Sequence, residues 1–206
     1  MGSSMTRAVQ TDVTLTPTPD GGGHRQIAFT LMLGAAPIGS SEIYIMNADG
    51  TNQRRLTYSS SDQWSPTWSP DGKAIAFTSH HEDKGEIYVM DANGSNLQRL
   101  TNLSKNADAP AWSPDGTEIA FIVGENNSNT IYLMDANGTH LRCLTDNSVT
   151  YNSPAWSPDG KLIAFAAHHD DDGINLNAIY VMNADGSNVR RLTNDPVDDE
   201  MPAWRP

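Results

Sequence analysis

The sequence contains only one cysteine, Cys143, and far fewer basic than acidic residues. A single cysteine excludes an intramolecular disulfide and any metal site built on several thiolates. The 13 Lys and Arg residues stand against 25 Asp and Glu residues, a net charge of −12, so the chain lacks the basic surface that nucleic-acid binding needs. No segment approaches the roughly 18 consecutive apolar residues of a transmembrane helix, so we expect no membrane span.

What the chain does contain is one unit repeated four times. Its clearest marker is a tryptophan that recurs at intervals of 44, 44 and 48 residues, at Trp68, Trp112, Trp156 and Trp204. The triplet Ile-Ala-Phe recurs with its last residue at Phe29, Phe77, Phe121 and Phe165. Ile-Tyr-x-Met begins at Ile43, Ile87, Ile131 and Ile179, and Leu-Thr begins at Leu56, Leu100, Leu144 and Leu192. Because four independent markers share one period, the repeat defines the architecture, and we expect each repeated tryptophan to fill the wedge between adjacent blades.

Each repeat is made of strand and turn signals. In the fourth, residues 161–166 and 178–182 are short apolar runs rich in β-formers, too short for helices. Ser-Pro-Asp-Gly at residues 157–160 predicts a tight turn, because proline presets φ and glycine takes the left-handed position. Four antiparallel strands in about 44 residues are typical of one propeller blade, which buries its faces only against neighbouring blades. We therefore predict an all-β fold, a β-propeller with four four-stranded antiparallel blades.

The two ends of the repeat array complement each other. The first unit lacks its own Pro-x-Trp strand, whereas residues 202–206 form such a strand without a blade. We expect this C-terminal strand to close the ring within one chain, since an intramolecular strand has the higher effective concentration. The alternative is an eight-bladed homodimer formed by exchange of this strand between two copies. The propeller is expected over residues 24–206, after a Thr/Pro/Gly-rich linker over residues 1–23 whose first five residues resemble a cloning remnant.

The repeat resembles that of the TolB-type β-propeller family. The resemblance rests on Trp-Ser-Pro-Asp-Gly, then Ile-Ala-Phe, Ile-Tyr-Val-Met and Arg-Leu-Thr, and it covers residues 24–206. The repeat is WD40-like but lacks the Gly-His and Trp-Asp signatures of WD repeats. Family members with six blades and a preceding helical domain differ from this chain, in which neither feature is visible. The resemblance implies a bacterial protein, periplasmic or at the cell surface, that binds partner peptides at the channel mouth.

No catalytic motif stands out in the sequence. A Gly-x-Ser-x-Gly elbow, a His-Glu-x-x-His zinc motif, a phosphate-binding glycine loop and a Cys/His nucleophile pair are all absent. We therefore predict that the chain is not an enzyme and requires no cofactor. Since similar repeats also form the propeller lids of prolyl-oligopeptidase-like enzymes, a lid domain of a larger peptidase-like enzyme remains an alternative.

Two histidine pairs are the candidate metal ligands. They follow the second strand of the second and fourth repeats, at His80, His81, His168 and His169. Histidines beside carboxylates suit a divalent metal. However, adjacent residues of an extended segment point to opposite sides, so solvated loops are the simpler interpretation. A metal-binding or small-ligand-binding module, with Ca²⁺ or another divalent ion, is a further alternative.

The strand order places most of the negative charge on one face of the propeller. The loops of this irregular face hold thirteen acids and two lysines, Lys84 and Lys105. The acids are Asp62, Glu82, Asp83, Asp108, Glu125, Asp146, Asp170, Asp171, Asp172, Asp195, Asp198, Asp199 and Glu200. A face of one sign around a pore attracts cations or a basic peptide.

The candidate binding residues lie two positions before the proline of each inner strand. The residue type at this position differs from repeat to repeat, although the flanking residues recur. The four residues are Trp64, Asp108, Asn152 and Glu200. One aromatic, one amide and two carboxylates suit an extended segment that carries Lys, Arg or an amino terminus. We therefore predict a non-catalytic interaction module that binds a protein or peptide segment, cationic in character, at the acidic channel mouth. We expect a monomer, with the homodimer as the alternative.

Overall fold

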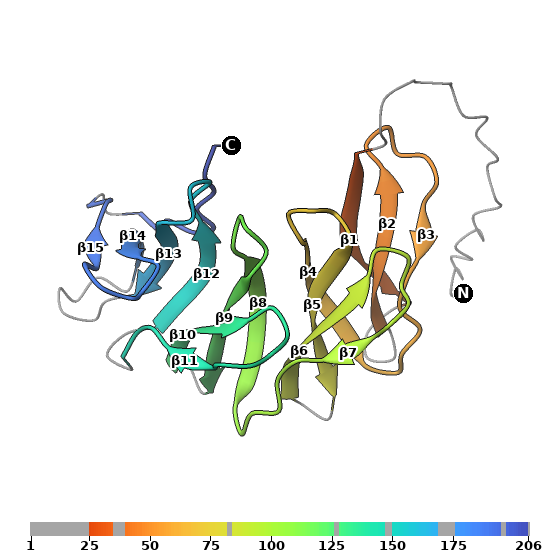
Figure 1. Cartoon of the computed structure of the whole chain (residues 1–206), viewed down its shortest axis with the longest axis horizontal. Coiled ribbons are helices and arrows are strands. Elements are labelled where there is room, and N and C mark those ends of the chain that lie inside the picture. The colour runs from red at the N-terminus through yellow and green to blue at the C-terminus, as the bar shows by residue number, and fades with distance from the viewer. Residues whose placement is uncertain are drawn as a thin grey trace, which may run out of the picture.

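A computed structural model describes residues 25–34, 40–81, 84–125, 128–146, 150–168, 176–194 and 197–205. Over these residues the chain is all-β, with fifteen strands in four antiparallel sheets that follow one another along the sequence. Figure 1 shows the sheets side by side in an arc, with the first and the last at opposite ends. No helix of the described residues is long and apolar enough to cross a membrane.

Each sheet is one blade, numbered in chain order. Blade 1 has three strands, β1 (Gln26–Leu33), β2 (Ser40–Asn47) and β3 (Arg54–Arg55). Blade 2 has four, β4 (Asp62–Trp68), β5 (Ala74–His81), β6 (Lys84–Asp91) and β7 (Gln98–Arg99). Blade 3 consists of β8 (Asn106–Trp112), β9 (Glu118–Glu125), β10 (Ser128–Asp135) and β11 (Arg142–Cys143). Blade 4 consists of β12 (Thr150–Trp156), β13 (Leu162–His168), β14 (Asn177–Asn183) and β15 (Arg190–Arg191).

The Ser-Pro-Asp-Gly segments form the predicted tight turns. In blade 4 the Gly160 amide donates to the Ser157 carbonyl at 2.9 Å, and Gly160 has a φ of 70°. The Ser157 hydroxyl donates to Asp159 Oδ1 at 2.7 Å and accepts the Leu162 amide at 3.0 Å. These bonds satisfy the polar groups at the corner and fix where β13 begins, so the same four residues set the same hairpin in blades 2, 3 and 4.

The inner strands β4, β8 and β12 each carry a β-bulge just before the proline. In blade 4 the pairing of β12 with β13 shifts between Asn152 and Ala155, and the intervening Ser153 has a φ of 50°. Ser65 and Ala109 have φ values of 52° and 51° at the equivalent positions. A bulge turns the side chains beside it away from the regular alternation of a strand. These bulges were not predicted from the sequence. They lie next to the candidate binding residues.

The hydrophobic core is divided into three clusters, one between each pair of adjacent blades. The cluster between blades 1 and 2 contains Ile43 and Ile45 from one sheet and Ile75 and Phe77 from the next. Trp156 packs in the cluster of blades 3 and 4, while Trp68 and Trp112 pack against the other two. The prediction that the repeated tryptophans fill the wedges between blades is therefore confirmed for these three residues.

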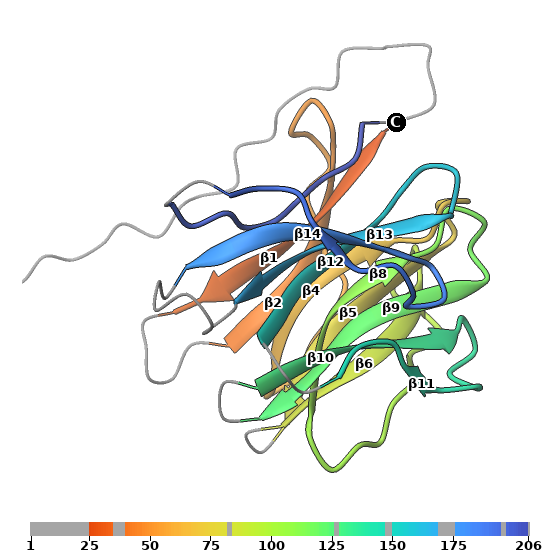
Figure 2. The ribbon, with the colours of Figure 1, turned by 90° about the vertical axis from the view of Figure 1, so that its left-hand side faces the viewer.

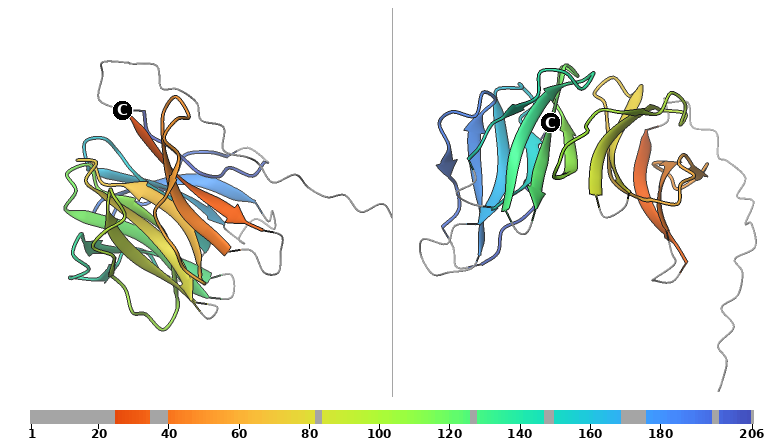
Figure 3. Two further views of the ribbon diagram at one scale, coloured as in Figure 1. Left: turned by 90° about the vertical axis from the view of Figure 1, so that its right-hand side faces the viewer. Right: turned by 90° about the horizontal axis from the view of Figure 1, so that it is seen from below.

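The predicted closure of the ring by the C-terminal strand is not confirmed. Within the described part of the chain, β1 pairs with β2 alone, and residues 197–205 belong to no sheet. Figure 3 shows that blade 1 and blade 4 end the arc on opposite sides, and Figure 2 shows the arc turned so that blade 4 faces the viewer. Blade 1 also has three strands instead of the predicted four, because no inner strand lies beside β1. Closure depends on the angle between successive blades, which the repeat pattern does not encode.

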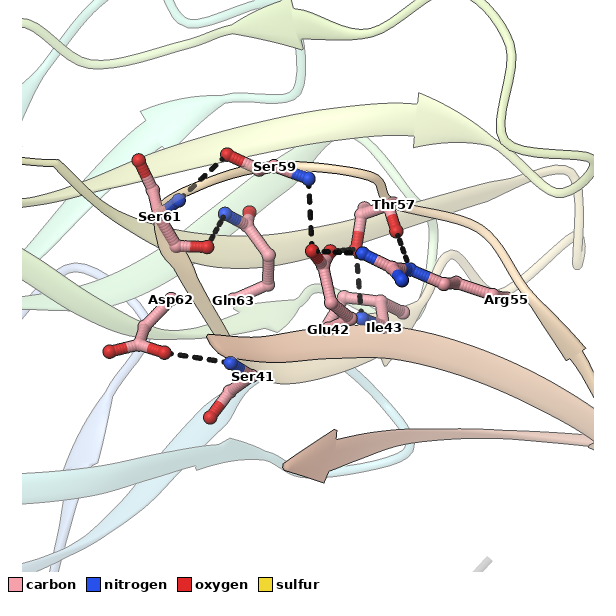
Figure 4. A network of polar contacts seen from close by, with 9 residues as sticks. All are labelled: Ser41, Glu42, Ile43, Arg55, Thr57, Ser59, Ser61, Asp62 and Gln63. Carbon is pink, nitrogen blue, oxygen red and sulfur yellow. Dashed lines mark hydrogen bonds and ion pairs between the residues drawn. The ribbon is translucent and has the colours of Figure 1, made fainter. Parts of the chain in front are cut away.

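A buried carboxylate ties the strands of blade 1 to the connection that follows them (Figure 4). Glu42 in β2 is fully buried and forms an ion pair with Arg55. The Glu42 carboxylate also accepts a hydrogen bond from the Thr57 hydroxyl and another, at 2.9 Å, from the Ser59 backbone amide. Arg55 Nε donates to the Thr57 carbonyl at 2.6 Å, which completes the set of contacts that we call the glutamate clamp. A buried charge is tolerated only when it is paired and hydrogen-bonded, as Glu42 is here.

Blade 2 repeats the glutamate clamp. Glu86 is buried, pairs with Arg99 at 2.7 Å and accepts the Thr101 hydroxyl. Arg99 Nε donates to the Thr101 carbonyl at 2.6 Å, the same distance as in blade 1. The outer-strand arginines that looked like exposed edge charges therefore bind a buried carboxylate in these two blades.

Candidate functional site

The four candidate binding residues occupy equivalent places beside the bulges. Trp64, Asp108 and Asn152 each precede the positive-φ residue of an inner strand, and Glu200 precedes Met201, whose φ is 52°. Because the bulge re-aims the side chain next to it, these positions leave the regular alternation of each strand. The structure does not bring all four together.

Two of the four residues line a cavity of about 360 Å³ on the irregular face. Asp108 and Asn152 reach it from β8 and β12, the inner strands of blades 3 and 4. The complete lining is His80, Asn106, Asp108, Ala109, Ile122, Gly124, Asn129, Asn152 and Ser153. This volume lies at the lower end of the range for ligand pockets and suits one or two side chains of a partner.

Asp108 supplies the carboxylate of the cavity. Its Oδ1 accepts a hydrogen bond from the Thr78 hydroxyl at 2.8 Å and another from the backbone amide of Ala109 at 2.6 Å. The Ser65 hydroxyl lies at 3.5 Å from the same oxygen. One carboxylate oxygen, Oδ1, therefore holds the bulge and the adjoining blade, and none of the described residues donates a hydrogen bond to Oδ2.

Side-chain amides surround this carboxylate. Asn129 Nδ2 donates to Asn152 Oδ1 at 3.2 Å, which links blade 3 to blade 4 across the cavity. Asn106 Oδ1 accepts the Gly85 amide at 2.9 Å, which links blade 3 to blade 2. Sequence reasoning missed both Asn106 and Asn129, although position 106 falls six residues before a repeat tryptophan, where a polar residue recurs.

His80 enters the cavity from β5 and packs against a glycine. A Cβ placed on Gly85 would lie 2.8 Å from the Ala107 carbonyl oxygen and 3.1 Å from His80 Nε2. Glycine is therefore required at position 85 for this close approach, and it fixes the place of the imidazole beside Asn106 and Asp108. The cavity thus combines one carboxylate, three amides and one imidazole.

The other two candidates lie outside the cavity lining. Trp64 is half-buried in β4 and pairs with Thr78 of β5. Glu200 is exposed and lies 3.5 Å from Asn177 Nδ2. Any contribution of these two residues to binding at the cavity would therefore be indirect.

The histidine pairs do not converge. His80 lines the cavity described above, whereas His81 lines a separate one on the other side of β5. His168 ends β13 in blade 4, and His169 lies outside the described residues. Among the described residues, no group of three or more His, Cys, Asp or Glu side chains is arranged to hold a metal ion.

Two acids of the irregular face hold the backbone of a neighbouring blade. Asp62 Oδ1 accepts the Ser41 amide of blade 1 at 2.7 Å. Asp198 Oδ1 accepts the Asn177 amide of blade 4 at the same distance. These carboxylates and Asn106 occupy one repeat position, and they tie β4, β8 and residues 197–205 to the preceding blade. The acids at 82, 83, 170–172 and 195 lie outside the described residues, as does the side chain at 125.

Comparison with protein families and known proteins agrees with this architecture. The profile of the family described as "TolB beta propeller domain" matches residues 12–206, and so begins within the segment interpreted above as a linker. The "Tol-Pal system protein TolB" of Desulfosudis oleivorans is 48% identical over 44 residues, which are 21% of this chain and 10% of that protein.

Two solved structures share the fold and part of the sequence. TolB from Acinetobacter baumannii has a TM-score of 0.73 and 28% identity, over 86% of this chain and 44% of its own. A putative TolB from Agrobacterium tumefaciens has a TM-score of 0.68 and 26% identity, over 80% of this chain and 60% of its own. The chain therefore spans less than two thirds of the length of each of these relatives.

Proposed function

This chain belongs to the TolB β-propeller domain family, and on that basis we propose that it is a non-catalytic interaction module. It binds an extended segment of a partner protein on its irregular face, with a Lys, Arg or amino-terminal group of that segment in the Asp108 cavity. Relatives that carry the TolB name belong to a Tol-Pal system, so the module is assigned to the bacterial periplasm or cell surface.

The observation that carries this proposal is the orientation of Asp108. Its Oδ1 accepts hydrogen bonds from Thr78 and Ala109, and the described residues that line the cavity include no second carboxylate and no Lys or Arg. A carboxylate without a cationic partner in a recess lined by amides favours a bound cation, because charge-assisted hydrogen bonds are the strong ones. The amides of Asn106 and Asn152 suit the backbone of an extended segment.

The charge of the whole chain supports the same ligand class. The net charge of −12 attracts a cationic segment over a distance, and salt screens that attraction. A small polar recess together with long-range attraction is suited to a reversible contact with a protein segment. We therefore expect the affinity to fall as the ionic strength rises.

Calorimetric titration with four decapeptides, rich in Lys, Arg, Glu or Ser, tests the proposal. The Lys-rich and Arg-rich peptides should bind, and Asp108→Asn should weaken their binding at least tenfold. The substitution keeps an acceptor oxygen for Thr78 and Ala109, so the fold should persist. A titration with Ca²⁺ in the same buffer distinguishes a cationic side chain from a hard metal ion as the ligand, since Ca²⁺ also prefers carboxylate and amide oxygens.

The matched control is Asp62→Asn. It removes the same charge from the same face and keeps the acceptor for the Ser41 amide, but position 62 does not line the cavity. The control should bind the cationic peptides within about twofold of the original chain. Equal losses in both variants, or an affinity that salt does not change, would contradict the assignment of the cavity.

A further inference from the structure

The outward face of blade 1 is an apolar sheet face, and none of the sheets in the described residues covers it. In blades 2, 3 and 4 the equivalent Ile, Phe and Met side chains are at most 1% exposed, because the preceding blade covers them. These buried residues are Ile75, Phe77, Met90, Ile119, Phe121, Met134, Ile163, Phe165 and Met182. In blade 1 the same positions are Ile27, which is 42% exposed, and the half-buried Phe29 and Met46. Blade 1 therefore has the apolar outward face of an interior blade, but no blade of the described residues packs against that face.

Residues 197–205, which we call the tail, follow blade 4 and carry the Pro-x-Trp sequence of an inner strand, although they belong to no sheet. Trp204 Nε1 donates to the Ala155 carbonyl at 3.0 Å, just as Trp156 Nε1 donates to the Ala111 carbonyl at 3.2 Å. The Asp198 carboxylate accepts a hydrogen bond from the Asn177 backbone amide, just as the Asp62 carboxylate accepts one from the Ser41 backbone amide. The tail is thus placed on blade 4 as the inner strand of a fifth blade, but none of the described strands pairs with it.

The tryptophan of blade 2 points to the same missing strand. Its counterparts Trp156 and Trp204 donate to the carbonyl of the middle residue of the preceding Pro-x-Trp segment. Blade 1 has no such strand among the described residues, and Trp68 Nε1 is buried without a hydrogen-bond partner. Trp112 Nε1 also lacks a partner although blade 2 has its inner strand, so this observation adds less than the exposed face and the tail.

We propose that two copies of this chain close one ring of eight blades, in which the tail of each copy serves as the inner strand of blade 1 of the other. One copy does not close the ring in this arrangement, because the tail contacts blade 4 and pairs with no strand of blade 1. The gain from intramolecular strand pairing is lost when geometry forbids the contact. A second copy supplies both missing parts, the inner strand and the apolar face.

The pairing within blade 4 predicts the register of this contact. There Trp156 lies opposite Ile163 and Ala155 opposite Ala164. By the same alignment, Trp204 of one copy lies opposite Ile27 of the other, and Ala203 lies opposite Ala28. Glu200 then becomes the channel-mouth residue of blade 1 of the other copy, so the set of four candidate positions is completed only between copies.

Light scattering coupled to size exclusion tests the number of copies. The chain should elute with twice its mass of 22.4 kDa. Ile27→Asp, which places a charge on the outward face of blade 1, should return it to a single copy. Leu97→Asp is the matched control, because Leu97 is an exposed apolar residue of blade 2, in the middle of the arc. This control should leave the mass unchanged.

A cysteine pair tests which surfaces meet. In a Cys143→Ser background, a copy with Ala28→Cys and a copy with Ala203→Cys are co-expressed and oxidised. A disulfide between the two chains is expected, since opposite residues of an antiparallel pair bring their Cβ atoms close together. Thr117→Cys, on an exposed turn of blade 3, replaces Ala28→Cys in the control and should give no disulfide.

The double variant, with both substitutions in one chain, separates the alternatives. A disulfide between chains supports the two-copy ring, whereas a disulfide within one chain shows a closed four-bladed ring and overturns the proposal. A mass of 22.4 kDa without any disulfide also overturns it, as would occur if residues ahead of β1 filled the inner position of blade 1. A mass that grows beyond two copies contradicts closure.

Discussion

The first two blades and the last two blades are stabilised by different contacts. Blades 1 and 2 each contain a glutamate clamp, in which Glu42 or Glu86 is buried and paired with an arginine of the outer strand. Blades 3 and 4 have Thr130 and Ala178 at those positions. Trp156 of blade 4 and Trp204 each donate to a neighbouring backbone carbonyl, whereas Trp68 of blade 2 and Trp112 of blade 3 do not. Among the described residues, the glutamate clamp is therefore a feature of the first two blades, and the tryptophan bond is a feature of the last blade and the segment that follows it.

The two members of the clamp vary independently, because blade 3 has neither the glutamate nor the arginine, whereas blade 4 has the arginine alone. Where the buried glutamate is lost in blade 3, the arginine opposite it is replaced by Cys143, whose thiol lies 2.8 Å from the Thr145 carbonyl. Arg191 of blade 4 donates to the Thr193 carbonyl at 2.6 Å. The constant element is therefore the carbonyl two residues along the chain, and the donor differs from blade to blade. Cys143 occupies this structural position, although in sequence it looks incidental.

The largest expected effect comes from removing one clamp. Glu42→Ala should lower the free energy of unfolding by about 3–5 kcal/mol, because it leaves Arg55, Thr57 and the Ser59 amide without their buried acceptor. Chemical denaturation followed by tryptophan fluorescence measures this loss. The control is Glu118→Ala, which breaks the partly exposed pair with Arg142 at 2.9 Å and should cost at most about 1 kcal/mol. Similar losses in the two variants would contradict the importance of burial.

A smaller effect is expected from building a clamp in blade 3. Thr130→Glu alone should destabilise the chain, since it places a carboxylate at a position that is 4% exposed without an arginine beside it. Cys143→Arg in the same chain should restore most of the stability, with a coupling energy of about 1–3 kcal/mol in a double-mutant cycle. Additive effects would show that blade 3 cannot accommodate the contact found in blades 1 and 2.

The interblade tryptophan bond is expected to contribute less than either clamp. Trp156→Phe and Trp112→Phe remove similar volume, but only Trp156 donates a hydrogen bond, to Ala111 at 3.2 Å. Trp156→Phe should therefore cost about 1 kcal/mol more than Trp112→Phe. Urea denaturation of the two variants provides the measurement. If the order is reversed, the second half of the chain is not held by this bond.

Sequence reasoning predicted the elements that depend on local chemistry. The strand order, the Ser-Pro-Asp-Gly turns and the tryptophan wedges follow from residue types within one repeat, and the alternation of His80 and His81 to opposite sides of β5 follows from strand geometry. The bulges at Ser65, Ala109 and Ser153 were not predicted, because their positive φ has no glycine to signal it.

The arrangement of the site and of the ring could not be predicted in the same way. Asn106 and Asn129 line the cavity because two neighbouring blades bring them together, which no spacing within one repeat reveals. Asp62 and Asp198 looked like surface charge, but each accepts a backbone amide of the preceding blade. The angle between blades, which decides between a ring and an arc, depends on packing across three interfaces rather than on the period of the sequence.

The smallest expected effect concerns the turns, which both halves share. Hydrogen bonds from the Ser69 hydroxyl and from the backbone amide of Lys73 lower the pKa of Asp71 from its ordinary 3.8 to about 2. The equivalent serine hydroxyls also lower the pKa values of Asp115 and Asp159. A carboxylate whose pKa is lower in the folded state stabilises the fold above its unfolded pKa and loses that effect as the pH falls. The turn of blade 2 should therefore weaken between about pH 4 and about pH 2, and the turns of blades 3 and 4 should also weaken as the pH falls below the ordinary pKa of aspartate.

Hydrogen exchange resolved by blade measures this weakening in both halves at once. Because these carboxylates are exposed, the change should be modest and of similar size at the turns of blades 2 and 4. Asp71→Asn keeps an acceptor oxygen but cannot titrate, so the turn of blade 2 should lose its pH dependence while that of blade 4 keeps it. If the turn of blade 2 kept its pH dependence in Asp71→Asn, the Asp71 carboxylate would not be the source of that dependence.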